Sequence, residues 1–174
     1  MRWGRRRPRL PAAVVTAASL VPGERVLAVA AVEGGWTFAT THALHVVTTL
    51  GEEGEPDTAR SVRWVDVRTA TTVPEERVLD VRLVDGARWA VPVGTAPRRL
   101  PETVRERVQN SVVQTYPVEV RRGRHVHVAA RRTPEEQVHV QVMADAGVDL
   151  SDPEVAALVA ETRERLEREL GLRG

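Results

Sequence analysis

The stretch VLDVRLVDGARWAVPV, residues 78–93, decides the fold because it holds two alternating runs joined by a turn. In the first run Leu79 and Val81 share one face, while charged residues occupy the other, which is typical of a half-buried strand. Asp85-Gly86 is a strong signal for a two-residue hairpin turn. The stretch therefore predicts an antiparallel hairpin with one apolar face.

The same alternation extends toward the N-terminus. Residues 24–49 contain three such runs, separated by the turn Glu33-Gly34-Gly35 and by a break at His42, and they predict a meander. Residues 50–59, LGEEGEPDTA, combine Gly, Pro and acids without an apolar period, so we expect an exposed loop there. Residues 61–73, SVRWVDVRTATTV, resume the alternation and predict one further strand.

Two longer periods predict helices. Leu100, Val104, Val108 and Val112 recur every four residues, with Pro101 and Glu102 suited to a first helical turn. A second helix is expected to begin at Ser151 and Glu154, which have the spacing of a capping box, and to end at Gly171. We expect its buried stripe to comprise Val155, Leu158, Val159, Leu166 and Leu170.

Between these helices lie three extended pieces, YPVEV at 116–120, RHVHVAA at 124–130 and EQVHVQV at 136–142. Their alternation divides the side chains between two faces. The first face is apolar and is expected to hold Val126, Val128, Ala130, Val138, Val140 and Val142. The second face is polar and is expected to hold His125, His127, His139 and Gln141.

Composition limits the classes of protein that fit. The 174 residues are 42% hydrophobic and 28% charged, as in an ordinary soluble globular domain with one core. The absence of Cys excludes disulfides, thiolate nucleophiles and zinc–thiolate sites. Five of the 25 basic residues lie within the first nine residues, so the rest of the chain is mildly acidic and poorly suited to coating a phosphate backbone.

Several of these segments together resemble the bacterial PH-like (pleckstrin-homology-like) domains. They are GERVLAVA, TTHALHVV, SVRWVDV, the 78–93 hairpin and LPETVRERVQNSVV, which span about residues 23–114. The chain is also similar, over nearly its whole length, to small uncharacterised proteins of high-GC bacteria. The PH-like resemblance implies a bent, partly closed barrel plugged by a helix, and it implies binding rather than catalysis. Members that grip phosphoinositides use a basic loop between the first two strands, whereas Glu33-Gly34-Gly35 is acidic here.

Pattern and resemblance together predict an α+β protein with three parts. Residues 1–22 form a basic tail and short helix. Residues 23–114 form the PH-like bent antiparallel sheet or partly closed barrel with its capping helix. Residues 115–174 form a three-strand antiparallel extension and a C-terminal helix, which we expect to pack on the same core.

The polar face of the extension offers the one candidate metal site. A turn centred between Thr133 and Pro134 would pair His127 with His139 and place His125 diagonally beside them, so three imidazoles could bind zinc or nickel. The alternative is a solvent-facing surface on which His replaces Gln or Thr, since no acid lies at a fixed spacing to orient the ligands. The second interpretation is favoured, and no metal or other cofactor is expected.

Arginines provide the candidate anion-binding residues. They lie in the tail, at Arg5, Arg6 and Arg7, and at one end of the predicted extension, at Arg121, Arg122 and Arg124. Such side chains could grip phosphate groups, or they could be solvated turn residues.

No nucleophile and base occur at a recognisable spacing around His42 and His45, so an enzyme is not predicted. We expect a non-enzymatic binding or scaffold module in the cytoplasm whose partner is another protein. The alternative is a peripheral binder of anionic lipid or nucleic acid through the arginine-rich N-terminus, and a small metal-dependent enzyme ranks third. The sequence does not determine the oligomeric state.

Overall fold

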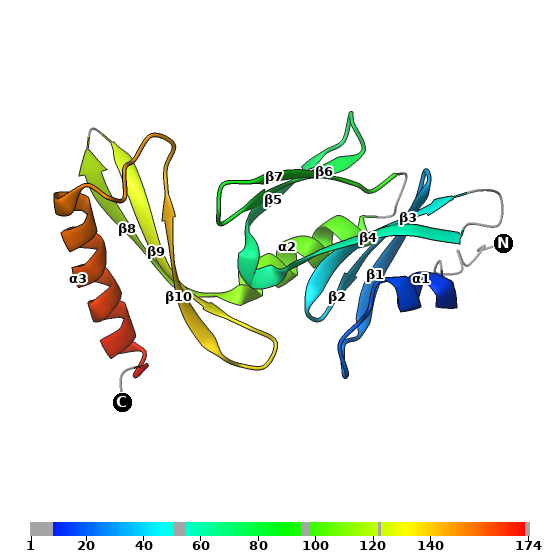
Figure 1. The fold of residues 1–174 in the computed structure, drawn as a ribbon, viewed down its shortest axis with the longest axis horizontal. Coiled ribbons are helices and arrows are strands. Elements are labelled where there is room, and N and C mark those ends of the chain that lie inside the picture. The colour runs from blue at the N-terminus through cyan, green and yellow to red at the C-terminus, as the bar shows by residue number, and fades with distance from the viewer. Residues whose placement is uncertain (1–8, 51–54, 95–97, 122, 173–174) are drawn as a thin grey trace. The chain divides into compact units, whose positions relative to one another are not determined.

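The computed structural model describes residues 9–50, 55–94, 98–121 and 123–172, and the chain divides into two compact units, Met1–Gln109 and Asn110–Gly174. The described residues form an α+β fold with three antiparallel sheets, ordered β1-β2-β3-β4, β5-β6-β7 and β10-β9-β8 (Figure 1). The elements are α1 (Ala12–Ala17), β1 (Val26–Val32), β2 (Gly35–Thr40), β3 (Ala43–Leu50), β4 (Glu55–Arg63), the 3-10 turn η1 (Trp64–Asp66), β5 (Val67–Val73), β6 (Val78–Leu83), β7 (Arg88–Pro92), α2 (Arg99–Ser111), β8 (Val112–Arg121), β9 (Arg124–Arg132), β10 (Val138–Ala144) and α3 (Pro153–Glu169).

The sheets are separate. No strand ladder joins one sheet to another among the described residues, so none of them closes into a barrel. The predicted α+β class is confirmed, and the three-strand sheet followed by a C-terminal helix is present as expected.

The β6–β7 hairpin confirms the central prediction of the sequence. Leu79 and Val81 are buried on one face. The turn differs from the expected two-residue type, because Leu83 N–H donates to Ala87 O at 2.8 Å and leaves three residues in the loop. The Asp85 carboxylate accepts a hydrogen bond from Ala87 N–H at 2.9 Å and so supports this wider turn.

The prediction of a loop at residues 50–59 is wrong for Leu50 and for residues 55–59, which the structure describes as strand. Strand β4 begins at Glu55 and pairs with β3 through Leu50↔Glu55 and Val47↔Ala59, while residues 51–54 lie outside the described residues. As an edge strand, β4 is mostly exposed and tolerates Pro56 and acidic side chains that a central strand would exclude.

The single strand expected over residues 61–73 is also wrong. The turn η1 separates β4 from β5, and the chain passes there from the four-stranded sheet to a three-stranded one. Trp64, Val65 and Val67 are all buried, which strict alternation would not allow.

The core of the first unit lies between its two sheets and α2, as Figure 1 shows. Leu100, Val104 and Val108 are buried on one stripe of α2, as their spacing predicts. The helix ends at Ser111, so Val112 begins β8 instead of extending that stripe. Helix α1 covers the other face of the four-stranded sheet, where Val14 packs in a cluster with Phe38 and Val47.

The second unit is a sheet covered on its valine face by α3 (Figure 1). Leu166 is fully buried and clusters with Val128 and Ala130. Asp152, not Ser151, is the N-cap, and its side chain accepts a hydrogen bond from the N–H of Glu154. Leu158 is 42% exposed, so its predicted place in the buried stripe is wrong.

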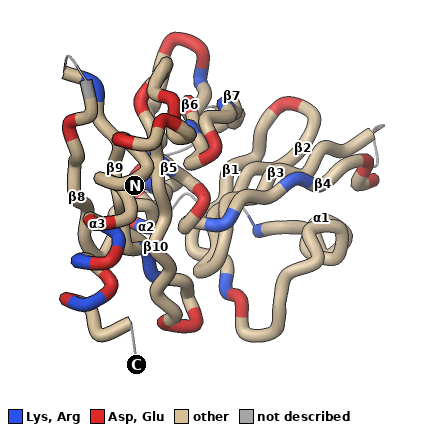
Figure 2. The backbone as a smooth tube through the Cα atoms, turned by 60° about the vertical axis from the view of Figure 1, so that its left-hand side comes forward, with Lys and Arg blue, Asp and Glu red and all other residues tan. Residues whose placement is uncertain are grey.

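Helix α3 carries interspersed acidic and basic residues (Figure 2). Arg163 Nε lies 2.8 Å from Glu167 Oε1, and Arg165 Nε lies 3.9 Å from Glu169 Oε1. Pairs at this spacing are typical of a solvated helix face. No helix in the described part of the chain is long and apolar enough to cross a membrane.

Candidate functional site

The predicted pairing of His127 with His139 is wrong. In the β9–β10 ladder, His127 lies opposite Met143 and His139 lies opposite Arg131. The loop explains the difference, because Thr133 N–H donates to Gln137 O at 2.8 Å and the turn is therefore centred on Glu135. The three histidines share one face as expected, but the register separates His139 from the other two.

His125 and His127 instead share an acid that the sequence analysis did not identify. Asp145 follows β10, and its two carboxylate oxygens lie 3.9 Å from His125 Nδ1 and 3.9 Å from His127 Nε2. The two imidazole ring centroids are 6.2 Å apart. Across the described ranges, no group of three or more His, Cys, Asp or Glu side chains is placed to hold a metal ion.

Another histidine, His45, belongs to a buried network in the first unit. His45 Nε2 lies 3.0 Å from Glu24 Oε1, the same oxygen that accepts a hydrogen bond from the Thr40 hydroxyl. Glu24 Oε2 accepts a hydrogen bond from Val21 N–H at 3.0 Å. The side chains of His45 and Glu24 are only 6% and 3% exposed, so this Thr-His-Glu cluster is buried within the first unit.

This network joins three of the five segments on which the expected PH-like resemblance rests. Glu24 comes from GERVLAVA, Thr40 and His45 come from TTHALHVV, and Trp64 of SVRWVDV donates its indole N–H to Thr40 O at 3.0 Å. Those short motifs therefore correspond to one connected set of buried hydrogen bonds.

Glu24 gives the fold a specific pH dependence. Burial raises the pKa of the Glu24 carboxyl, but the hydrogen bonds from Thr40, Val21 N–H and His45 outweigh burial, and the net pKa is lowered. A lowered carboxyl pKa stabilises the folded state above the unfolded-state pKa of about 4.3, and this stability is lost as the pH falls through the folded pKa.

We therefore expect Glu24→Gln to cost about 2 kcal/mol at pH 7, because a neutral amide loses the charge-assisted hydrogen bonds that the carboxylate accepts from Val21 N–H, Thr40 and His45. Urea denaturation from pH 7 to pH 3 measures both effects. The variant should also lose part of the wild-type acid sensitivity, and identical pH profiles would contradict the assignment.

Of the arginines predicted to bind anions, Arg124 lies in a cleft. Arg5, Arg6, Arg7 and Arg122 lie outside the described residues, and Arg121 ends β8. Arg124 is exposed at the start of β9, and its Nη1 donates to Gly147 O at 2.8 Å. A Cβ at Gly147 would lie 2.3 Å from that Nη1, so glycine allows the guanidinium to lie against the loop.

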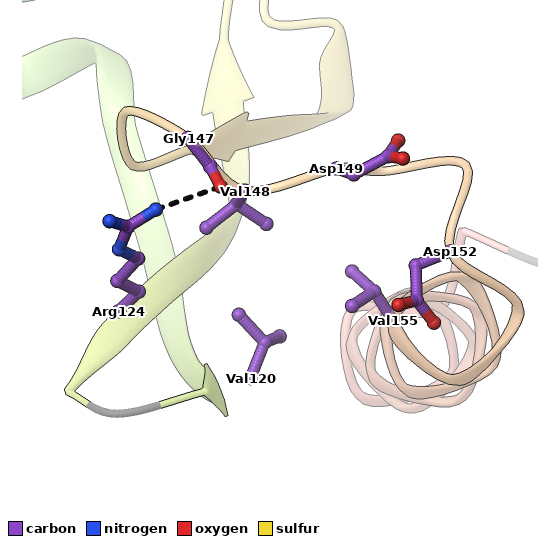
Figure 3. Close-up of a pocket in the computed structure, with 7 residues that line it drawn as sticks. All are labelled: Val120, Arg124, Gly147, Val148, Asp149, Asp152 and Val155. Atoms are coloured by element: carbon purple, nitrogen blue, oxygen red, sulfur yellow. Dashed lines mark hydrogen bonds between the residues drawn. The ribbon is translucent and has the colours of Figure 1, made fainter.

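The cleft around Arg124 lies in the second unit and measures about 540 Å³. In Figure 3, Arg124 stands on one side and two aspartates stand on the other, with three valines between them. The lining residues come from the end of β8, the start of β9, the loop after β10 and the start of α3. They are Val120, Arg124, Gly147, Val148, Asp149, Asp152 and Val155.

Hydrogen bonds fix the two aspartates. Asp149 Oδ1 accepts hydrogen bonds from Ser151 Oγ at 2.6 Å and from Ser151 N–H at 2.8 Å, and these bonds lower the pKa of the Asp149 carboxyl. Asp152 Oδ1 accepts a hydrogen bond from Glu154 N–H at 3.0 Å at the start of α3. The Asp149 carboxyl is therefore ionised at neutral pH, and both aspartate side chains are held in place.

The charges of the cleft disfavour the anion site predicted at Arg124. Two carboxylates face one guanidinium, so the cleft repels a phosphate group on balance. Its centre is apolar, and Val155 is buried beneath it while Val120 and Val148 are partly exposed. This arrangement fits a ligand that carries an apolar group together with charges of both signs.

Sequence reasoning identified Arg124 but not the rest of the cleft. The segment Ser151-Asp152-Pro153-Glu154 predicted the start of a helix, and the helix does start there, with Asp152 as its N-cap. Nothing in the local pattern indicated that this helix start would lie beside the β8–β9 hairpin. The chain matches no protein-family model, no curated protein and no solved structure.

Proposed function

We propose that the protein is a non-enzymatic, cytoplasmic binding module that holds a segment of another protein in the cleft of residues 110–174. We further propose that residues 23–114 are a PH-like domain. The order of elements supports this second point: a four-stranded sheet is followed by a three-stranded sheet and then by α2, whose apolar stripe lies in the core.

The observation that carries the proposal is the combination of an apolar centre with a rim of both charges. Protein interfaces have this anatomy, in which a desolvated apolar contact is surrounded by polar groups. Arg124 retains N–H donors beyond the one bonded to Gly147, so it can also pair with a carboxylate of the partner. Asp149 can pair with a Lys or Arg. The segment we expect therefore has an apolar residue flanked by a base and an acid.

Affinity capture from a native lysate tests this function when it is combined with a cleft variant. Val148→Ser removes apolar surface at the cleft, and Leu158→Ser is a matched control on the exposed face of α3 outside the cleft. We expect the wild type and Leu158→Ser to retain the same partner in mass spectrometry, and Val148→Ser to lose most of it. Failure to retain a reproducible partner, or equal retention by Val148→Ser, would count against the proposal.

The arginine-rich N-terminus supports a second proposal, peripheral attachment to anionic lipid or nucleic acid. Five arginines within the first nine residues provide the positive charge that such binding requires. We expect deletion of residues 1–9 to abolish sedimentation with acidic vesicles or DNA and to remove the salt dependence of that binding. Full-length protein that binds neither would rule out this role.

A further inference from the structure

We propose that the first unit has a separate site for a small ligand bearing a diphosphate group, in a cleft between the start of β1 and one face of α2. The cleft measures about 390 Å³, which lies within the range of small-ligand sites. Arg25 and Thr41 line it from the strand side. Helix α2 contributes Arg99, Thr103, Glu106 and Arg107.

The positions on α2 place the donors on one stripe. Arg99, Thr103 and Arg107 are spaced by four residues, so they lie on the same face of the helix. The rise of the helix separates the first and last of them by about 12 Å along the axis. Arginines at both ends of a stripe favour an elongated ligand over a compact ion.

The charge of this cleft is opposite in sign to that of the cleft in Figure 3. Three arginines and one acid, Glu106, line the cleft. Thr103 adds a neutral hydroxyl, whereas the Thr41 hydroxyl is already bonded to Arg25 N–H and to His42 Nδ1. Guanidinium forks bind phosphate oxygens in pairs. Inorganic pyrophosphate has enough terminal oxygens to give each of the three forks its own pair, whereas one orthophosphate does not.

Arg107 has hydrogen-bond donors that are weakly paired or unpaired and could bind a ligand. Its side chain is 28% exposed, and its Nη2 makes a long contact of 3.3 Å with Glu106 Oε1. Its Nε is buried and has no hydrogen-bond acceptor among the described residues. A phosphate that enters the cleft can replace the weak contact between Arg107 and Glu106. A rotation of the Arg107 side chain would then let its Nε donate to the phosphate as well.

Isothermal titration of the full-length protein with inorganic pyrophosphate at low ionic strength tests the site. We expect saturable binding that is about tenfold tighter than that of orthophosphate, because more charge-assisted hydrogen bonds form. Arg107→Gln should weaken pyrophosphate binding about tenfold or more. Glu106→Gln should strengthen it several-fold, because the competing carboxylate is removed. Absence of saturable pyrophosphate binding by the wild type would overturn the proposal.

Arg105→Gln is the matched control, since Arg105 is exposed on the same helix but does not line the cleft. We expect it to leave the affinity unchanged. Equal weakening by Arg105→Gln and Arg107→Gln would indicate general charge attraction and would overturn the site. If Arg107→Gln unfolds, Glu106→Gln still tests the site, because Glu106 is exposed and its replacement should raise the affinity for pyrophosphate. An unchanged affinity in Glu106→Gln would count against the proposal.

Two competitors identify the source of the diphosphate. ADP should displace pyrophosphate if the ligand is a soluble diphosphate ester. Vesicles containing an anionic lipid should displace it if the group belongs to a membrane headgroup. Either result supports the site, whereas displacement by neither would contradict a diphosphate-bearing ligand larger than the inorganic ion.

Discussion

Leu166→Ala is expected to lower the free energy of unfolding of the second unit by about 2–5 kcal/mol. Leu166 is fully buried where α3 covers the valine face of the sheet, and it clusters with Val128 and Ala130. Truncation removes apolar contact and leaves a cavity that small neighbours cannot fill. Urea denaturation followed by far-UV circular dichroism measures the loss, and hydrogen exchange of the β9 amides localises it.

Leu158→Ala is the control on the same helix. Leu158 is 42% exposed, so its truncation should change the free energy of unfolding by no more than about 0.5 kcal/mol. Similar losses at Leu158 and Leu166 would contradict the packing of α3 that positions Asp152 and Val155 at the cleft.

Gly35→Ala is expected to cost about 2–5 kcal/mol in the first unit. Gly35 has φ of 155°, and a Cβ there would lie 2.1 Å from the carbonyl oxygen of Val47 on the paired strand β3. The obstructing atom belongs to the backbone of a central strand, so relief requires β2 and β3 to separate. Tryptophan fluorescence reports this loss, because Trp36, Trp64 and Trp89 all lie in this unit.

Gly34→Ala separates the two causes of that loss. Gly34 has φ of 69°, but an added Cβ meets nothing within 4 Å, so only backbone strain remains. We expect a cost of about 1–2 kcal/mol for this variant. Equal costs at Gly34 and Gly35 would show that the close approach of β3 contributes nothing.

The sequence predicted those parts of the fold in which one face is clearly apolar. Leu79 and Val81 are buried where the period of two places them, and Val128 and Ala130 cluster with Leu166 of α3. In such strands a shift by one residue would expose the whole apolar set, so the pattern alone fixes which face is buried. The stripe on α2 could be predicted for the same reason.

Other elements depend on contacts that a local pattern does not encode. Strand β4 resembles a loop in sequence because its edge position tolerates Pro56 and acids. The β9–β10 register depends on Glu136, which has φ of 63° and is not a residue type that signals a left-handed conformation. That single loop conformation separates His139 from His127.

The candidate cleft could be predicted only in part. Arg124 and Asp152 each stood out locally, as a hairpin arginine and as part of a helix start. The cleft forms because the β8–β9 hairpin, the loop after β10 and the start of α3 meet, which is a property of the tertiary packing. The apolar centre that favours a protein segment over a phosphate therefore became evident only in three dimensions.

Selection of peptides from a displayed random library, followed by NMR mapping on the full-length protein, tests the binding function most directly. We expect enriched peptides with an apolar residue between a base and an acid, and shifts in the amide signals of Val120, Arg124, Val148 and Asp149. Peptides without that pattern, or amide shifts confined to other residues, would contradict it.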